Sequence, residues 1–425
     1  MKALAHISNI DIDIPLYANI VVAFGRGDGG NLKNGKHLPR VQRIVIDDMR
    51  LSATHFYIWI VQFDSTLDGV CYIQDVSKNG TYVNGDKVGN GRYTILRHGD
   101  CISIGDTVFE FELVGGVKKT EVCKRVGHWS ILDDVIGIGT FGQVQIAINN
   151  KDKGYYAVKR IKKSTNKGVD AEYSLLRRLK HENIVKVTDD TAIENCIFQE
   201  LAIGGDLFSY LSQEGCDEGS TLHGLPEPEA IFALFQICQG LLYLHKNGIV
   251  HRDLKLDNIF VMGAPISYPR LAIGDFGIAR DIKECHGRMK TMVGTAEYAA
   301  PEILLPRENS KLEDNNFATS ITSITAKTYT SKVDVWSVGV IAHILFTGIS
   351  PFYGSTLDEM RDRTERGVGS LTNWATDTSP TGQEFVKETL AVDANKRPSV
   401  EQMVHHKVFD HGGRSVIMAR IKRKV

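Results

Sequence analysis

The sequence lacks a cysteine pair with C-x-x-C spacing and a long uninterrupted apolar run. Its seven cysteines are scattered, which argues against a disulfide framework or a cysteine-based zinc site and favours reduced thiols. The most apolar stretch, residues 333–348, contains Asp334 and His343 and is too short to span a bilayer. We therefore expect a buried helix there. Asp11 and Asp13 interrupt the region where a signal peptide needs an apolar core, so secretion is not expected.

The chain also lacks an excess of charge of either sign. It has 50 Lys and Arg residues against 51 Asp and Glu residues, for a formal net charge of −1. This balance provides no global attraction to nucleic acid or to a membrane surface, and neither is expected as a direct partner. A length of 425 residues predicts two or three domains.

The first 117 residues have a pattern of short strands. Residues 55–63 form a β-branched and aromatic run, and turn dipeptides such as Asn79-Gly80, Asn84-Gly85 and Asn90-Gly91 follow. This pattern predicts an all-β sandwich over residues 1–117. The polar, basic residues 118–128 are expected to form a linker. Beyond them, strands give way to helical spacing, for example over residues 171–179 and 230–244, which predicts an α+β domain.

A glycine-rich segment and a lysine open this second region. In Gly137-Ile-Gly-Thr-Phe-Gly142-Gln-Val144 the glycines let backbone N–H groups approach a polyphosphate, but this motif alone also fits dinucleotide folds. Tyr156-Ala-Val-Lys159 follows on a strand, and Glu172 opens a helical run. A lysine paired with such a glutamate is the arrangement that kinases use to hold the α- and β-phosphates.

Two further motifs favour phosphoryl transfer over a dinucleotide oxidoreductase. In His251-Arg-Asp253-Leu-Lys255-Leu-Asp-Asn258, Asp253 would accept the proton of a substrate hydroxyl and Lys255 would neutralise the moving phosphoryl group. Asn258 and the aspartate of Asp275-Phe-Gly277 would be the Mg²⁺ ligands. The order and spacing of these motifs carry the interpretation, because each tripeptide alone is common by chance.

With Ala300-Pro-Glu302, Asp334-Val-Trp-Ser-Val-Gly339 and Arg397 added, residues 129–410 resemble a bilobal eukaryotic protein kinase of the calcium/calmodulin-dependent group. The resemblance implies a serine/threonine kinase, a small lobe ending near residue 202, and an Arg397–Glu302 pair. It implies an ATP site made by Ile136, Gly137, Gly139, Gly142, Val144, Lys159, Glu172, Glu200, Ala202 and Asp206. Asp206 could instead contact a basic substrate, or simply cap a helix. No essential motif is missing, which disfavours a pseudokinase scaffold.

The N-terminal region resembles a forkhead-associated (FHA) domain. The motifs are Gly25-Arg26, Arg50-Leu-Ser52-Ala-Thr-His55 and Asn79-Gly-Thr-Tyr-Val-Asn-Gly85. The resemblance implies that Arg26, Ser52 and Asn79 grip a phosphothreonine, and a guanidinium offers bidentate donors to phosphate. Gly25, Gly80, Asn84 and Gly85 are expected to be turn formers, and His55 to brace the loop that carries Ser52. Ala53 departs from relatives that often have a polar residue there.

This combination of domains resembles the checkpoint kinases that respond to DNA breaks, and most closely the fungal meiosis-specific type, with a mitotic relative as the alternative. We expect Thr291 to be the activating phosphosite and Thr295 a second candidate. The hypothesis is that a phosphothreonine scaffold concentrates copies of the chain for phosphorylation in trans. Asp206, Asp257 and the resemblance predict substrates with upstream basic residues. The basic tail 411–425 is either a nuclear-entry signal or a frayed end, and the Ser/Thr-rich insert 307–331 is assumed to be loop filler.

Overall fold

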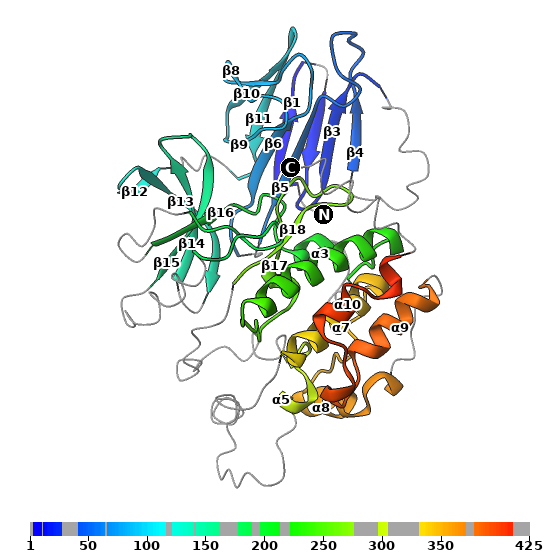
Figure 1. Ribbon diagram of the computed structural model, residues 1–425. Helices are drawn as coiled ribbons and strands as arrows, with labels where there is room; N and C mark the ends of the chain where they lie inside the picture. The colour runs from blue at the N-terminus through cyan, green and yellow to red at the C-terminus, as the bar shows by residue number, and fades with distance from the viewer. Residues whose placement is uncertain are drawn as a thin grey trace. The chain divides into compact units, whose positions relative to one another are not determined.

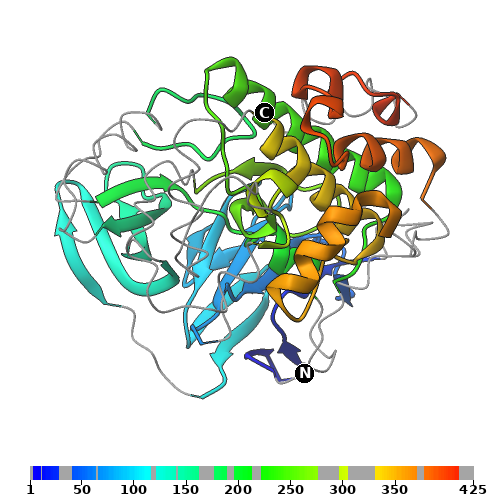
Figure 2. The same cartoon turned by 90° about the horizontal axis from the view of Figure 1, so that it is seen from below.

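A computed structural model describes residues 3–10, 12–27, 41–63, 66–115, 121–139, 142–161, 177–188, 196–212, 222–275, 296–304, 331–370 and 378–410. The chain divides into two compact units. Unit 1 comprises Met1–Thr165, Val187–Glu218 and Val261–Pro269, and unit 2 comprises Asn166–Lys186, Gly219–Phe260 and Arg270–Val425. Figure 1 and Figure 2 show the elements of both units.

The N-terminal part of unit 1 is the all-β sandwich that the sequence predicted. One sheet has the order β2-β1-β11-β10-β7-β8 and the other β4-β3-β5-β6-β9. The strands are β1 (Ala5–Ser8), β2 (Asp13–Leu16), β3 (Val21–Gly25), β4 (Val41–Val45), β5 (Phe56–Val61), β6 (Val70–Asp75), β7 (Tyr82–Val83), β8 (Asp86–Lys87), β9 (Tyr93–Leu96), β10 (Asp100–Ile104) and β11 (Thr107–Leu113).

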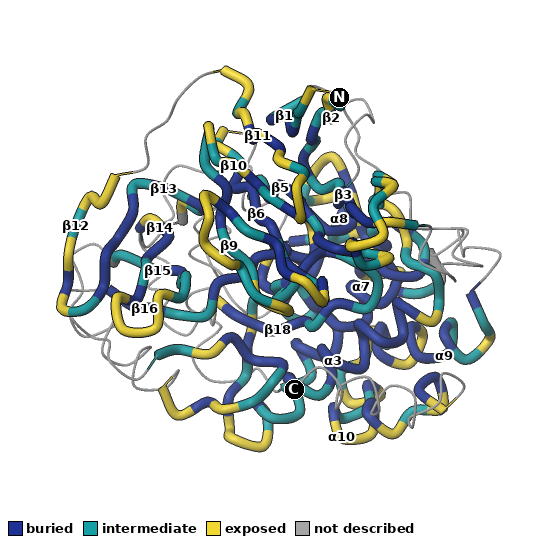
Figure 3. Tube along the Cα trace, turned by 90° about the horizontal axis from the view of Figure 1, so that it is seen from above, coloured by how far each residue is buried: buried dark blue, intermediate teal, exposed yellow. Residues whose placement is uncertain are grey.

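Alternation along the strands builds the core between these sheets. Phe56, Ile58 and Ile60 of β5 point to one side, as every second residue of a strand must, and join Phe109 and Phe111 of β11. All five side chains are almost fully buried. Figure 3 shows β5 and β6 as buried over most of their length. The sandwich therefore presents its connecting loops from a rigid framework.

The second part of unit 1 is an antiparallel sheet of order β12-β13-β14-β15-β16. Its strands are β12 (Val122–Val126), β13 (Trp129–Gly139), β14 (Gly142–Asn149), β15 (Tyr155–Ile161) and β16 (Cys196–Glu200), followed by helix α2 (Leu207–Leu211). β12 corrects the sequence analysis, which assigned residues 118–128 to a linker. Val122–Val126 pairs with β13 through backbone hydrogen bonds, and such pairing requires no apolar side-chain pattern.

Unit 2 is mainly helical and contains a two-stranded ribbon. Helix α7, the predicted buried helix, packs against α3 and α9 (Figure 1). No described helix is long and apolar enough to cross a membrane. The elements are α3 (Glu227–Lys246), η1 (Leu256–Asn258), β17 (Ile259–Val261), β18 (Leu271–Ile273), α5 (Pro301–Leu304), α7 (Lys332–Thr347), α8 (Leu357–Arg366), η3 (Gly367–Ser370), α9 (Pro380–Thr389), η4 (Ala394–Lys396), α10 (Val400–Met403) and η5 (Lys407–Phe409).

Local chemistry sets the ends of these helices. α3 begins with Pro228 in its first turn, flanked by Glu227 and Glu229, and ends with His245 and Lys246. Proline is pre-organised for a first turn. Acidic residues near the N-terminus and basic residues near the C-terminus interact favourably with the helix dipole. The chain leaves α7 through Gly348, whose φ of 73° suits glycine. The five cysteines in the described residues are free.

Candidate functional site

The structure brings Arg26, Ser52 and Asn79 to one group of loops on the sandwich. The backbone N–H of Arg26 donates to the carbonyl of Ser52 at 3.0 Å. The amide of Asn79 donates to the carbonyl of Arg50 at 2.6 Å, and the backbone N–H of Lys78 donates to the Ser52 hydroxyl at 3.1 Å. Arg26 and Asn79 are exposed. A guanidinium, a hydroxyl and an amide therefore line one accessible surface, which we call the phosphate rim (Arg26, Ser52 and Asn79).

His55 braces this rim, as the sequence analysis expected. Its ring is 1% exposed. Nδ1 accepts the backbone N–H of Ser52 at 3.2 Å, and Nε2 lies 3.1 Å from the carbonyl oxygen of Gly80. This pattern corresponds to a neutral ring with its proton on Nε2, which donates to Gly80. One buried side chain thus joins the Ser52 loop to the loop that follows Asn79.

Gly25 differs from its predicted role as a turn former, whereas Gly80, Gly85 and Asn84 have the positive φ angles of turn residues. Gly25 is the last residue of strand β3, and a Cβ atom there would lie 2.0 Å from the carbonyl oxygen of Ala53. The position requires glycine because two backbone segments approach closely. Sequence alone does not distinguish this from a turn.

Arg50 is a further residue at the rim, to which the sequence analysis gave no role. Its guanidinium bonds Asp48 at 2.7 Å and Asp106 at 2.5 Å. The hydrogen bonds from Arg50 lower the pKa of the Asp48 carboxyl to about 2. A second exposed guanidinium therefore stands beside Asn79. The sequence could have indicated this role, because Arg50 lies two residues before Ser52 in the motif Arg50-Leu-Ser52-Ala-Thr-His55.

Three of the predicted nucleotide-binding residues of unit 1 share a row across three strands. Gly137 of β13 lies opposite Val144 of β14, and Val144 lies opposite Lys159 of β15. Opposed residues of antiparallel strands place their side chains on the same face. Val144 and Lys159 therefore project from the same face of the sheet. The backbones of Gly139 and Gly142 pair at the tip of this hairpin.

The segment expected to meet adenine follows β16. Glu200 is the last residue of that strand and pairs with Tyr156, and Ala202 comes two residues later. Asp206 acts as the N-cap of α2, since its carboxylate accepts the backbone N–H of Ser209 at 2.7 Å. This is the capping role that the sequence analysis left open. Its contact with ATP remains a prediction.

In unit 2 the structure gathers the predicted catalytic residues around one carboxylate. The Asn258 amide donates to the Asp253 carbonyl at 2.7 Å and to its carboxylate at 3.2 Å. The Lys255 ammonium lies 3.8 Å from the same carboxylate. A base, a cation and an amide from six consecutive residues therefore converge. Because the amide nitrogen of Asn258 donates to Asp253, its amide oxygen is the atom that suits a metal.

Asp334 holds this loop in place, a role that the sequence analysis missed. Its carboxylate, 1% exposed, accepts the backbone N–H groups of His251 at 2.9 Å and Arg252 at 2.8 Å. It also lies 2.8 Å from Nε2 of His245. A buried carboxylate requires such donors. The sequence signal was an aspartate inside the most apolar run.

Asp275 is tied to the same loop through its neighbour. Gly274 donates its N–H to the carbonyl of Asn258 at 2.9 Å, and its own carbonyl lies 3.2 Å from Nε2 of His251. Asp275 is exposed and has a φ of 49°. The described residues contain no group of three His, Cys, Asp or Glu that could hold a metal by itself. One carboxylate and one amide oxygen suit Mg²⁺, which takes its remaining ligands from substrate phosphates and water.

Several parts of the sequence interpretation lie outside the described residues. They include Glu172, the proposed partner of Lys159, with most of the helix expected over residues 171–179; the candidate phosphosites Thr291 and Thr295; the insert 307–331, apart from Ser331; and the tail 411–425.

Comparison with known proteins identifies the family of each part of the chain. The protein kinase domain model matches residues 131–409, and the FHA domain model matches residues 22–105. The chain therefore belongs to the protein kinase family. It is an FHA-containing serine/threonine protein kinase, a class defined by a phosphothreonine-peptide-binding domain joined to an ATP-dependent enzyme that acts on protein substrates.

The relatives that match most of the chain include two meiosis-specific kinases. The meiosis-specific serine/threonine-protein kinase MEK1 of Saccharomyces cerevisiae is 35% identical over 94% of this chain and 82% of its own length. The Schizosaccharomyces pombe mek1 kinase is 33% identical over 84% and 77%. A crystal structure of Rad53 residues 1–466 in complex with AMP-PNP covers 96% of this chain and 100% of that structure, with 26% identity and a TM-score of 0.51.

Proposed function

We propose that this kinase is recruited through its FHA domain to phosphothreonine on a scaffold protein and is activated there by mutual phosphorylation of the activation segment. The names of the two fungal relatives support a meiotic role. Together with the resemblance to checkpoint kinases, they support signalling at DNA breaks within the nucleus. The alternative is a role in the mitotic DNA-damage response.

The observation that carries the proposed chemistry is the convergence of Asn258 and Lys255 on the Asp253 carboxylate. Asp253 would orient the substrate hydroxyl and accept its proton. Lys255 would offset the charge of the transferred phosphoryl group, and Lys159 would hold the α- and β-phosphates. Mg²⁺, held by Asn258 and Asp275, would supply neutralisation of the phosphate charge.

Substrate selection would rest on acidic side chains. Asp257 is exposed at the catalytic loop. Burial raises the pKa of the Glu297 carboxyl, and the negative charge of Asp257 raises it further. Two neighbouring carboxyl groups are stabilised by a cation placed between them. This supports the expected preference for Arg or Lys upstream of the phosphorylated residue, which a peptide array comparing the wild type with Asp257→Ala would test.

Recruitment is tested with phosphothreonine peptides immobilised at increasing density on beads. With ATP and Mg²⁺, phosphorylation of Thr291 in the full chain should accelerate with peptide density, because tethering raises the local concentration toward the millimolar range. Arg26→Ala should abolish the acceleration, and Arg125→Ala, at an exposed position on β12, should retain it. Equal activation of the wild type and Arg26→Ala would contradict recruitment.

Mixing experiments test whether the phosphorylation occurs in trans. The Asp253→Ala chain should receive phosphate at Thr291 when it is mixed with wild-type chain on the same beads. A labelled Asp253→Ala chain that stays unmodified beside active wild type would contradict the trans mechanism.

A further inference from the structure

The sandwich has a second apolar surface that faces away from its core. Along β5, Phe56, Ile58 and Ile60 fill the core, so Trp59 and Val61 point to the opposite side. Antiparallel sheets usually have polar side chains on the face outside the core. Here the outer face is apolar and buried, and we call it the docking face: Val21, Trp59, Val61, Val70, Tyr72 and Ile95.

Kinase residues of unit 1 cover the docking face. They form one apolar cluster with it: Leu132, Ile136, Ile146, Ala157, Leu201, Ile203 and Ala264. Ile136 is itself one of the predicted ATP-site residues, Val144 packs against the same cluster, and Leu201 and Ile203 flank Ala202. The FHA side chains thus pack against the framework of the nucleotide site.

Trp59 makes the central polar contact of this interface. Its indole N–H donates to the carbonyl of Ile203 at 2.7 Å, and the side chain is 0% exposed. An indole has only this donor, and burial without a partner would be costly. The bond fixes Trp59 against the backbone one residue beyond Ala202.

Arg97 makes a charged contact at the start of the kinase sheet. Nη1 and Nη2 bond the two carboxylate oxygens of Asp134 at 2.9 Å and 2.7 Å. Asp134 is 8% exposed and lies two residues before Ile136. A bidentate pair constrains orientation as well as distance. It therefore fixes the position of β13 where that strand approaches the glycine-rich hairpin.

Aromatic rings continue the contact along the sheet edge. Trp59 stacks on Tyr72 with ring centroids 5.7 Å apart, Tyr72 meets Tyr93 at 6.2 Å, and Tyr93 meets Tyr155 of β15 at 6.5 Å. Such pairs add directional packing to the burial of apolar area. The Tyr72 hydroxyl is buried and has no hydrogen-bond partner in the described part of the chain.

We propose that the FHA domain is a structural part of the nucleotide site, with Trp59 and Arg97 as positioning residues that hold the Leu201–Ile203 segment and β13 for ATP. The proposal rests on the kinase function. Docking leaves the phosphate rim accessible, since Arg26 and Asn79 are exposed. The same FHA domain therefore reads phosphothreonine with its loops and supports the kinase with its sheet.

The test uses the full chain and three readouts: hydrogen exchange over residues 93–97, 129–139 and 196–205, the Kd for AMP-PNP with Mg²⁺ by calorimetry, and the Kd for a phosphothreonine peptide. Arg97→Ala and Trp59→Phe should each speed exchange at both sides of the interface. Each should weaken AMP-PNP binding by roughly three- to tenfold, within the range expected for a lost hydrogen bond to a charged or buried group. Phosphopeptide affinity should not change, because the rim is intact.

Two controls distinguish positioning from general destabilisation. The swap of Arg97→Asp with Asp134→Arg should restore AMP-PNP affinity to within about twofold of the wild type, the usual margin for an independent pair. Tyr72→Phe removes only a hydroxyl that has no described partner, so AMP-PNP affinity and exchange should stay at wild-type values.

Three outcomes would overturn the proposal. Unchanged exchange in Arg97→Ala would mean that the FHA domain is not docked in solution. Faster exchange with unchanged AMP-PNP affinity would mean that docking does not position the nucleotide site, and tighter AMP-PNP binding would mean that docking obstructs it. All three can be measured without phosphoryl transfer, so they remain distinguishable from a failure of the kinase function.

Discussion

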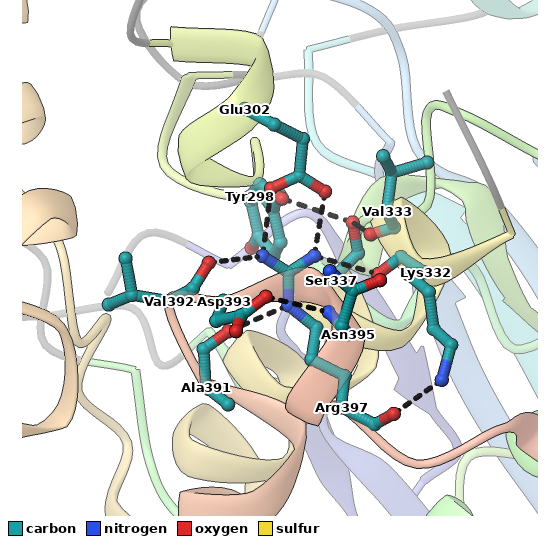
Figure 4. Close-up of polar contacts among 10 residues, drawn as sticks. All are labelled: Tyr298, Glu302, Lys332, Val333, Ser337, Ala391, Val392, Asp393, Asn395 and Arg397. Carbon is teal, nitrogen blue, oxygen red and sulfur yellow. Dashed lines mark hydrogen bonds and ion pairs between the residues drawn. The ribbon is translucent and has the colours of Figure 1, made fainter. Parts of the chain in front are cut away.

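Arg397 and Glu302 form two parallel hydrogen bonds, from Nη1 to Oε1 at 2.7 Å and from Nη2 to Oε2 at 2.8 Å. Figure 4 shows the guanidinium enclosed by carbonyl groups, including those of Ala391 and Val392. The cation also lies 5.0 Å from the centre of the Trp336 ring. The pair, expected from family resemblance, joins the end of the activation segment to the helical core of unit 2.

Removing this arginine should destabilise the large lobe. Arg397 is 2% exposed, and truncating one partner of a buried ion pair costs about 3–5 kcal/mol because the other partner is left uncompensated. Arg397→Ala should therefore lower the free energy of unfolding by about that amount in urea titrations. Arg397→Lys should also destabilise, since lysine cannot form the bidentate bond. The matched control is Arg366→Ala, an exposed ion pair with Asp362, for which we expect a loss below about 1 kcal/mol.

Gly25 and Gly27 provide a matched pair at the phosphate rim. In Gly25→Ala the new Cβ would lie 2.0 Å from the carbonyl oxygen of Ala53, so the segment that carries Ser52 must move. We expect a loss of about 1–3 kcal/mol of stability, as for other overpacked sites. We also expect phosphothreonine-peptide binding to weaken by about tenfold, the equivalent of one lost charge-assisted bond. Gly27→Ala meets no atom within 4 Å and should bind like the wild type; equal affinities for both variants would contradict the close-approach explanation.

Asp334 should matter for turnover more than for substrate binding. Asp334→Asn keeps the shape of the side chain but replaces one acceptor oxygen by a donor, which cannot accept the N–H of His251 or Arg252. We expect kcat to fall by about 10²-fold, the cost of misplacing a catalytic group by about 1 Å. Steady-state kinetics with saturating peptide test this, alongside Asp362→Asn on the exposed face of α8 as the control. Wild-type kcat in a folded Asp334→Asn chain would show that the carboxylate does not orient the catalytic loop.

Burial of His343 should make stability depend on pH. The ring is 2% exposed, and Nδ1 donates to the carbonyl of Ile349 at 2.8 Å. Burial lowers the pKa of His343 below its ordinary value of 6.5. Between the lowered pKa of the folded chain and pH 6.5, the unfolded chain therefore binds more protons than the folded chain. The stability that the neutral His343 ring contributes is thus fully present above pH 6.5 and is lost as the pH falls through this window.

Urea unfolding between pH 7.5 and 5.5 measures the effect. The wild type should lose stability on acidification, with a slope of at most about 1.4 kcal/mol per pH unit from this one group. His343→Gln should have a shallower slope, although not a flat one, because burial also lowers the pKa of His181 and His406. Parallel pH profiles for the wild type and the variant would contradict the assignment to His343.

Much of the fold could be predicted from local patterns in the sequence. The β-branched and aromatic run over residues 56–61 and the Asn-Gly turns indicate a sandwich, and the apolar run at 333–348 indicates a buried helix. β12 could not be predicted, because only Val126 of Val122–Val126 is buried and the segment has no alternation of apolar and polar residues. Its place depends on backbone pairing with β13, which no local pattern encodes.

The candidate site also has a part that the sequence predicts and a part that it does not. Asp253, Lys255 and Asn258 lie within six residues, so their convergence follows from a short loop. The Arg97–Asp134 pair and the contact of Trp59 with Ile203 join residues that are distant in the chain. The sequence indicates only that β5 has apolar side chains on both of its faces, whereas packing in the sandwich core requires them on one face. It does not indicate which surface covers the second face.

The proposed roles of Asp253 and Lys255 are tested by transfer of the γ-phosphate from ATP to a Ser/Thr peptide with upstream arginines, in the presence of Mg²⁺. The comparison is between the wild-type full chain and Asp253→Ala. We expect phosphorylated peptide from the wild type and a decrease of at least about 10²-fold for the variant, the lower range for loss of a general base. Equal rates for the two chains, or no transfer by a folded wild-type chain that is phosphorylated at Thr291, would contradict these roles.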